Sequence, residues 1–126
     1  MKTKRLGDAE LEIMMVLWDE SKPVTAGYIL SRIKETRSWA LSTLMATLAR
    51  LAEKGFVYCD RTTRTNLYSA LISAEEYRAS EGKSLFQRLY NGSAKKMIAS
   101  LYSSNAISKE DLAELRDYID QLEKGD

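Results

Sequence analysis

The segment from Trp39 to Gly55 carries the pattern that most limits how this chain can fold. Leucines recur in it at intervals of three and four residues, at Leu41, Leu44, Leu48 and Leu51. This spacing predicts one apolar stripe along a helix. The opposite face would carry small and polar side chains with a single guanidinium: Ser42, Thr43, Ala46, Ala49 and Arg50. Gly55 stands where a left-handed residue is expected to end the helix. A face of this kind can lie against a flat or grooved partner.

The residues after Gly55 change from helical to alternating periodicity. Phe56 to Cys59 and Asn66 to Leu71 predict two strands. Their connection lacks glycine, so a loose wing is expected instead of a tight turn, with Arg61 and Arg64 at its tip. This order is typical of a recognition helix followed by a wing. An ordinary surface helix packed on a hairpin has the same order, and this segment alone leaves both interpretations open.

Two helices are expected before this segment. Asp8 is placed to cap the first, from Ala9 to Glu20, with a core stripe of Leu11, Met14, Met15 and Trp18. The only proline then breaks the helix, and Val24 can add a short extended piece. Thr25 caps the second helix, whose inward positions are Ala26, Ile29, Leu30 and Ile33. Two helices joined by a short turn, the second with a small polar face, predict a helix-turn-helix.

The composition argues against catalysis. The 126 residues include no histidine, the commonest general base and metal ligand, and the carboxylates suggest no convergent pair. Cys59 is the only cysteine, so no intrachain disulfide is possible. We therefore predict no enzyme, no cofactor and no metal. The longest apolar run, from Ile13 to Trp18, cannot span a bilayer, and no signal peptide is visible. These features predict a cytoplasmic protein without direct membrane binding.

The net charge of +1 conceals an asymmetry between the two halves of the chain. Residues 1–72 hold 11 Lys/Arg and 8 Asp/Glu, which gives +3, whereas residues 73–126 hold 8 and 10, which gives −2. The basic excess lies with the predicted recognition helix and wing, a weak indication of nucleic-acid binding. The predicted contacts to double-stranded DNA are Lys4, Thr25, Ser42, Thr43, Ala46, Thr47, Arg50, Arg61 and Arg64.

Residues 73–126 predict a second, helical domain. Ser73 with Glu76 has the pattern of a capping box and marks the boundary after residue 72. Asn91-Gly92 ends this helix, and Ser93 and Ser108 cap two more. Three short helices have little core of their own, which favours completion by a second copy. The predicted interface residues are Leu85, Leu89, Leu101, Tyr102, Leu112, Leu115, Ile119 and Leu122, the last four at heptad-like spacing. Packing back on the N-terminal half as a monomer is the alternative.

The chain resembles the penicillinase-repressor (BlaI/MecI/CopY) family of bacterial transcriptional regulators over nearly its whole length. The resemblance rests on Trp18, the Thr25 cap, Trp39-x-x-x-Thr43, Arg50-Leu51, Lys54-Gly55-Phe56, Tyr68-Ser69 and the three-helix tail. It implies a homodimeric repressor with an N-terminal winged helix on a palindromic operator and a helical dimerisation domain. In resistance members it further implies a membrane sensor-protease that triggers cleavage in the tail. A winged-helix module that binds a protein and no DNA is the alternative function.

Two family features are altered in this sequence. Resistance repressors are cut between asparagine and phenylalanine in the middle tail helix, whereas the matching bond here is Ser100-Leu101, the candidate cleavage site. Copper-sensing members carry C-terminal cysteines, and this chain ends in LEKGD, so thiolate metal sensing has no ligands. Release by proteolysis, by a ligand between the tail helices, or by neither therefore stays open.

Overall fold

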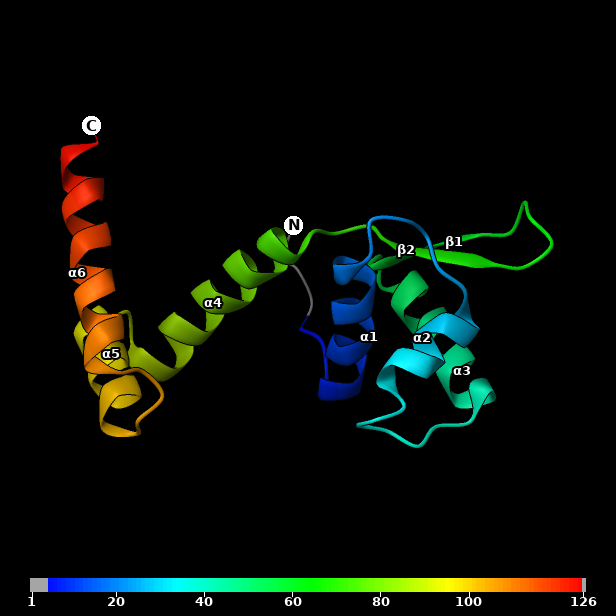
Figure 1. The fold of residues 1–126 in the computed structure, drawn as a ribbon, viewed down its shortest axis with the longest axis horizontal. Coiled ribbons are helices and arrows are strands. Elements are labelled where there is room, and N and C mark those ends of the chain that lie inside the picture. Colours follow the sequence, from blue (N-terminus) through cyan, green and yellow to red (C-terminus); the bar gives the residue numbers. More distant parts are fainter. Residues whose placement is uncertain (1–4, 126) are drawn as a thin grey trace. The chain divides into compact units, whose positions relative to one another are not determined.

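The computed structural model describes residues 5–125, which contain six helices and one two-stranded antiparallel sheet. The elements are α1 (Asp8–Asp19), α2 (Ala26–Ile33), α3 (Leu41–Glu53), β1 (Val57–Asp60), β2 (Leu67–Ala70), α4 (Ala74–Tyr90), α5 (Ala94–Ser103) and α6 (Lys109–Lys124) (Figure 1). This order confirms a mainly helical fold with a small hairpin. No helix in the described range is long and apolar enough to cross a membrane.

The chain divides into two compact units inside α4, one ending at Glu81 and the other beginning at Gly82. The first unit includes the start of α4 because Tyr77 is buried, and its hydroxyl accepts the backbone N–H of Leu6 at 2.9 Å. The Tyr77 ring also lies 5.9 Å from that of Trp18. The functional boundary that we place between residues 72 and 73 remains a prediction.

The core of the first unit lies where α1, α2, α3 and the hairpin come together (Figure 1). The side chains with no exposure are Ile13, Met14, Ile29, Leu44, Leu48 and Leu51. The leucine stripe of α3 is therefore confirmed, except at its first member. Leu41 is 47% exposed, because α3 begins at this residue and Ala40 is its N-cap. Trp39, predicted to start the helix, lies before it.

The first helix differs from its prediction at its cap and at its buried face. Gly7, not Asp8, is the N-cap of α1, and its backbone N–H donates to the Glu10 carboxylate at 2.9 Å. Met15, predicted in the core, is 58% exposed. The buried residues are Ile13, Met14, Val16 and Leu17. α1 contacts both α2 and β2, so it buries a broader face than a single stripe.

The hairpin is joined to the segment between α1 and α2. β1 pairs antiparallel with β2, and residues 61–66 form the connection, which confirms the loose wing. Val24 forms the predicted extended piece: its N–H donates to the Tyr68 carbonyl at 3.0 Å, and the Tyr68 N–H donates to the Val24 carbonyl at 2.7 Å. This pairing fixes the start of α2 beside the hairpin.

The predicted helix boundaries in the C-terminal half are confirmed. The hydroxyls of Ser73, Ser93 and Ser108 each accept a backbone N–H in the first turn of α4, α5 and α6. Asn91 and Gly92 both have positive φ, at 47° and 75°, and end α4. N-caps and helix-ending residues depend only on residues close by in the chain, so these boundaries can be predicted from the sequence alone.

The second unit has no buried side chain of its own among residues 82–125. Leu89, Ile119 and Leu122 are 62%, 45% and 54% exposed. The other apolar positions of these helices are at best half-buried, a small core for independent stability.

Candidate nucleic-acid interface

The outward face of α3 is small, polar and free of bulky groups at its centre. Ser42, Thr43, Ala46 and Arg50 are the predicted contact residues on this helix, and the leucines behind them are buried. Ser42, Thr43, Ala46 and Arg50 are all exposed, and Ala46 offers a methyl group instead of a polar one. The face is held at a fixed angle, because Leu44, Leu48 and Leu51 anchor three successive turns in the core.

Thr47 does not belong to this face, which corrects the prediction from sequence. Its side chain is buried, with 2% exposure. Its hydroxyl donates to the Thr43 carbonyl at 3.0 Å and accepts from Arg50 Nη2 at 3.3 Å. Thr47 cannot reach a base edge from this position, and instead holds the Arg50 guanidinium against the helix. It is therefore not among the proposed DNA contacts.

A groove of about 370 Å³ runs beside α3, between the helix, the start of α2 and the wing. Its lining includes Thr25, Leu41, Met45, Arg64 and Asn66. The sequence predicts Leu41 in the core stripe and Asn66 in a strand, and it assigns no contact to Met45. Met45 follows Leu41 by four residues, and this helical spacing is the feature of the sequence that indicates the two apolar side chains lie side by side.

Thr25 serves first as a helix cap. Its hydroxyl oxygen accepts the backbone N–H of Tyr28 at 3.1 Å, and its own hydrogen remains available for a donor contact. The N-terminus of a helix favours anions, because its first backbone N–H groups lack partners within the helix. The Thr25 end of α2 is therefore suited to a phosphate beside the groove.

The wing is ordered at its base by Asp60. The Asp60 carboxylate accepts the hydroxyl of Thr62 at 2.6 Å and its backbone N–H at 2.9 Å. These two hydrogen bonds hold the pKa of Asp60 below its ordinary value. Arg61 and Arg64 are exposed on the same loop. Local hydrogen bonding thus positions a short loop with two guanidinium groups on it.

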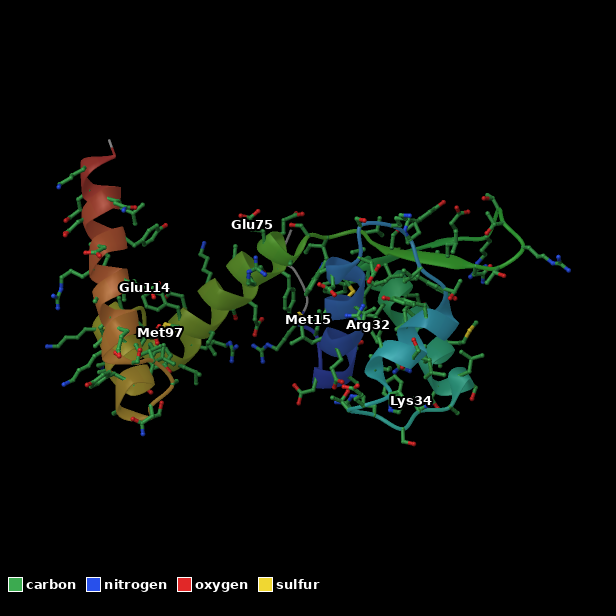
Figure 2. All side chains as sticks on the ribbon, in the orientation of Figure 1. Met15, Arg32, Lys34, Glu75, Met97 and Glu114 are labelled. Carbon is green, nitrogen blue, oxygen red and sulfur yellow. The ribbon has the colours of Figure 1, made fainter. Side chains whose placement is uncertain are left out.

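Ion pairs separate the cations of the first unit into two groups. Arg32, on α2 (Figure 2), pairs with Asp19 and Glu20, at 2.9 Å and 3.0 Å. Arg37 pairs with Glu12 at 2.6 Å, and Lys54 is likewise paired. Among residues 5–125, Arg50, Arg61 and Arg64 make no ion pair, so their charges are available to phosphate. Lys4 lies outside the described residues.

The predicted interface and cleavage residues all lie in the second unit. Leu85, Leu101, Leu112 and Leu115 are half-buried, and Leu89, Tyr102, Ile119 and Leu122 are exposed. The Ser100-Leu101 bond lies inside α5, with Ser100 exposed and its carbonyl accepting the N–H of Ser104 at 3.1 Å. The described residues contain no group of three side chains that could hold a metal ion.

Two solved structures are similar to about three fifths of this chain. The DNA-binding domain of the repressor BlaI is 29% identical, with a TM-score of 0.52 over 61% of this chain and 94% of that one. The monomeric form of Bacillus licheniformis BlaI, solved in complex with the blaP half-operator, is 29% identical, with a TM-score of 0.51 over 60% of this chain and 92% of that one. These similarities confirm the winged-helix fold.

Sequence comparison extends the relationship over the whole chain. The penicillinase repressor of Bacillus licheniformis is 27% identical over 120 residues, which cover 95% of this chain and 93% of the relative. The penicillinase repressor of Staphylococcus aureus is 22% identical over 123 residues, with 98% and 97% covered. The family model described as penicillinase repressor matches residues 6–121. The chain therefore belongs to the penicillinase repressor family, a family of transcriptional repressors and not of enzymes.

Proposed function

We propose that this protein is a transcriptional repressor that binds a palindromic operator in double-stranded DNA as a homodimer. The observation that carries the proposal is the exposed polar face of α3, flanked by the guanidinium groups of Arg50, Arg61 and Arg64, which make no ion pair within residues 5–125. A helix of this kind inserts into the major groove, while the wing and neighbouring helix ends contact the backbone. The half-operator complex of a relative supports one such unit per half-site.

The contacts divide by chemistry. Arg50, Arg61 and Arg64 would bind phosphates, which orient the protein without recognising sequence. Ser42 and Thr43 can donate to or accept from base edges. Thr25, at the start of α2, would donate to a phosphate next to the groove.

The uncovered apolar surface of the second unit supports the homodimer. Residues 82–125 bury no side chain, and Leu112, Leu115, Ile119 and Leu122 repeat along α6 at intervals of three and four. A matching helix from a second copy would cover this row. Two recognition helices would then fit half-sites about one helical turn apart, roughly 34–36 Å. Repression would be steric, because the dimer covers promoter DNA in the cytoplasm.

Release by a membrane sensor-protease is a separate part of the proposal. The candidate bond, Ser100-Leu101, lies within the hydrogen-bonded turns of α5. A protease would reach it only after local opening of this helix. Mass spectrometry of the protein from cells before and after induction would test it, since cleavage there yields two defined fragments.

Binding to a random-sequence duplex tests the main proposal, because a repressor should bind any duplex weakly through its phosphate contacts. If the dimer makes about six to ten such contacts, affinity should fall on the order of 10³- to 10⁵-fold between 50 and 200 mM salt. An affinity independent of salt, or no binding at low salt, would overturn the proposal and favour a protein-binding module.

A further inference from the structure

Two large apolar side chains are exposed on the surface that we assign to DNA. Leu41 is 47% exposed and Met45 is 40% exposed, four residues apart on α3. Both line the groove between α3, the start of α2 and the wing. Residues four apart on a helix are neighbours, so these side chains form one continuous apolar strip.

The core does not explain this strip. Leu44, Leu48 and Leu51 of the same helix are fully buried, so the stripe that packs α3 is complete without Leu41 and Met45. Single exposed hydrophobic residues are common on protein surfaces, but an adjacent pair in a groove indicates contact with a partner. The partner must present apolar surface and accept positive charge, because Arg64 lines the same groove and has no ion pair within residues 5–125.

We infer that Leu41 and Met45 determine specificity by packing against the C5-methyl groups of thymine in the major groove. This inference rests on the proposed function, because it concerns the same surface. Thymine is the standard base that offers a methyl group to the major groove, and the adjacent phosphates supply the negative charge that Arg64 requires. Ser42 and Thr43 point away from the helix axis in other directions than Leu41 and Met45. The apolar strip and the hydroxyl groups would therefore contact different base pairs.

The inference predicts that removal of one methyl group per thymine weakens binding without any change in charge. The probes are a 30-base-pair alternating A·T duplex and the same duplex with deoxyuridine in place of every thymine. Fluorescence anisotropy at low salt measures both affinities with the full-length protein. The thymine duplex should bind more tightly by about fourfold for each methyl group that is buried, as expected for burial of one methyl-sized group.

Matched variants assign the effect to the strip. Met45→Gln and Leu41→Asn keep the length or branching of an exposed side chain but make it polar, so the fold should be kept; urea unfolding checks this. Each variant should show a smaller preference for thymine than the parent protein, and the variant with both changes should bind the two duplexes with nearly equal affinity. Arg64→Ala should weaken binding to both duplexes by the same factor and keep the preference for thymine.

The outcomes separate the inference from the proposed function. Binding of the parent protein to both duplexes with equal affinity, or an undiminished thymine preference in the variant that carries both Met45→Gln and Leu41→Asn, overturns the inference and leaves DNA binding intact. Binding to neither duplex overturns both, and would favour an apolar segment of another protein as the occupant of the groove.

Discussion

Lys54 Nζ lies 2.8 Å from the Glu10 carboxylate and joins the end of α3 to the first turn of α1. The Glu10 side chain is only 13% exposed, and its other oxygen accepts the N–H of Gly7. Burial raises the pKa of Glu10, but the Gly7 hydrogen bond, Lys54 and Arg50 outweigh burial and lower the pKa below its ordinary value. This contact therefore stabilises the orientation of α3 relative to α1.

Replacement of Glu10 by glutamine should lower the free energy of unfolding by roughly 1–2 kcal/mol near neutral pH, because it removes a partly buried charged hydrogen bond. The folded pKa lies below the unfolded pKa, so the carboxylate stabilises the fold above the unfolded pKa. That contribution is lost as the pH falls through the folded pKa. Urea unfolding at neutral and strongly acidic pH should show the two proteins converging in acid. A constant difference would contradict this assignment.

Thr47→Val tests whether the buried threonine is structural. Valine keeps the shape but removes the hydroxyl that holds Arg50, so DNA affinity should fall several-fold through a less ordered phosphate contact. Base preference should stay the same, since the side chain is buried. Thr43→Ala, on the exposed face, should instead change the preference. Selection from a random duplex library measures the base preference of each variant. An altered preference in Thr47→Val would show that Thr47 contacts bases after all.

Arg61→Ala and Arg64→Ala should each weaken binding about equally across DNA sequences, because phosphates carry no sequence information. Each should also make the dependence of affinity on salt less steep, by about one counterion for every phosphate that the variant no longer binds. Arg32→Ala is the matched control, since Asp19 and Glu20 already neutralise this side chain. Titrations at several salt concentrations measure the slopes. If Arg32→Ala changed the slope as much as the wing variants, the wing would not be a specific contact.

Ile119→Asp should convert the proposed dimer to a monomer and weaken operator binding by orders of magnitude. The Ile119 side chain is 45% exposed in the single chain, so the change should affect association more than folding of the chain itself. Gln121→Asp introduces the same charge on a different face of α6 and should leave the dimer unchanged. Sedimentation velocity distinguishes them. A dimer that survives Ile119→Asp would exclude this row as the interface.

Two glycines should respond to alanine in opposite directions. Gly55 has a φ of 88° with open space around its Cβ position, so Gly55→Ala should destabilise the first unit by about 1–2 kcal/mol through backbone strain alone. Gly82 lies inside α4 with open space and no positive φ, so Gly82→Ala should stabilise the protein by about 0.5–1 kcal/mol. Thermal unfolding measures both shifts. Equal signs would contradict the backbone argument.

The sequence predicts the ends of most elements well, because caps depend on residues close together in the chain. Thr25, Ser73, Ser93 and Ser108 accept the hydrogen bonds expected of N-caps. Asp8 is the first residue of α1 and not its N-cap. The N-cap is Gly7, whose backbone N–H donates to the Glu10 carboxylate.

The side of each helix that becomes buried was harder to predict. Met15 and Leu41 fit an apolar stripe but are exposed, and Thr47 fits a polar face but is buried. Helical periodicity gives the angle of a residue around its axis, while burial depends on which neighbours surround that axis. Only the packed structure shows that the inward face of α3 is centred between Leu44 and Leu51, which places Thr47 inside and Leu41 at the rim of the groove.

Residues 82–125 contain no buried side chain, so in the proposed dimer the folding of this half would depend on protein concentration. If a second copy supplies the missing cover, dilution removes the helices' main source of stability, and the midpoint of thermal melting should rise with the amount of protein. In the cell, the rate of synthesis would then help to set how much of the tail is folded. A modest fall in the amount of this protein would then lower operator occupancy more steeply than independent binding at each half-site would.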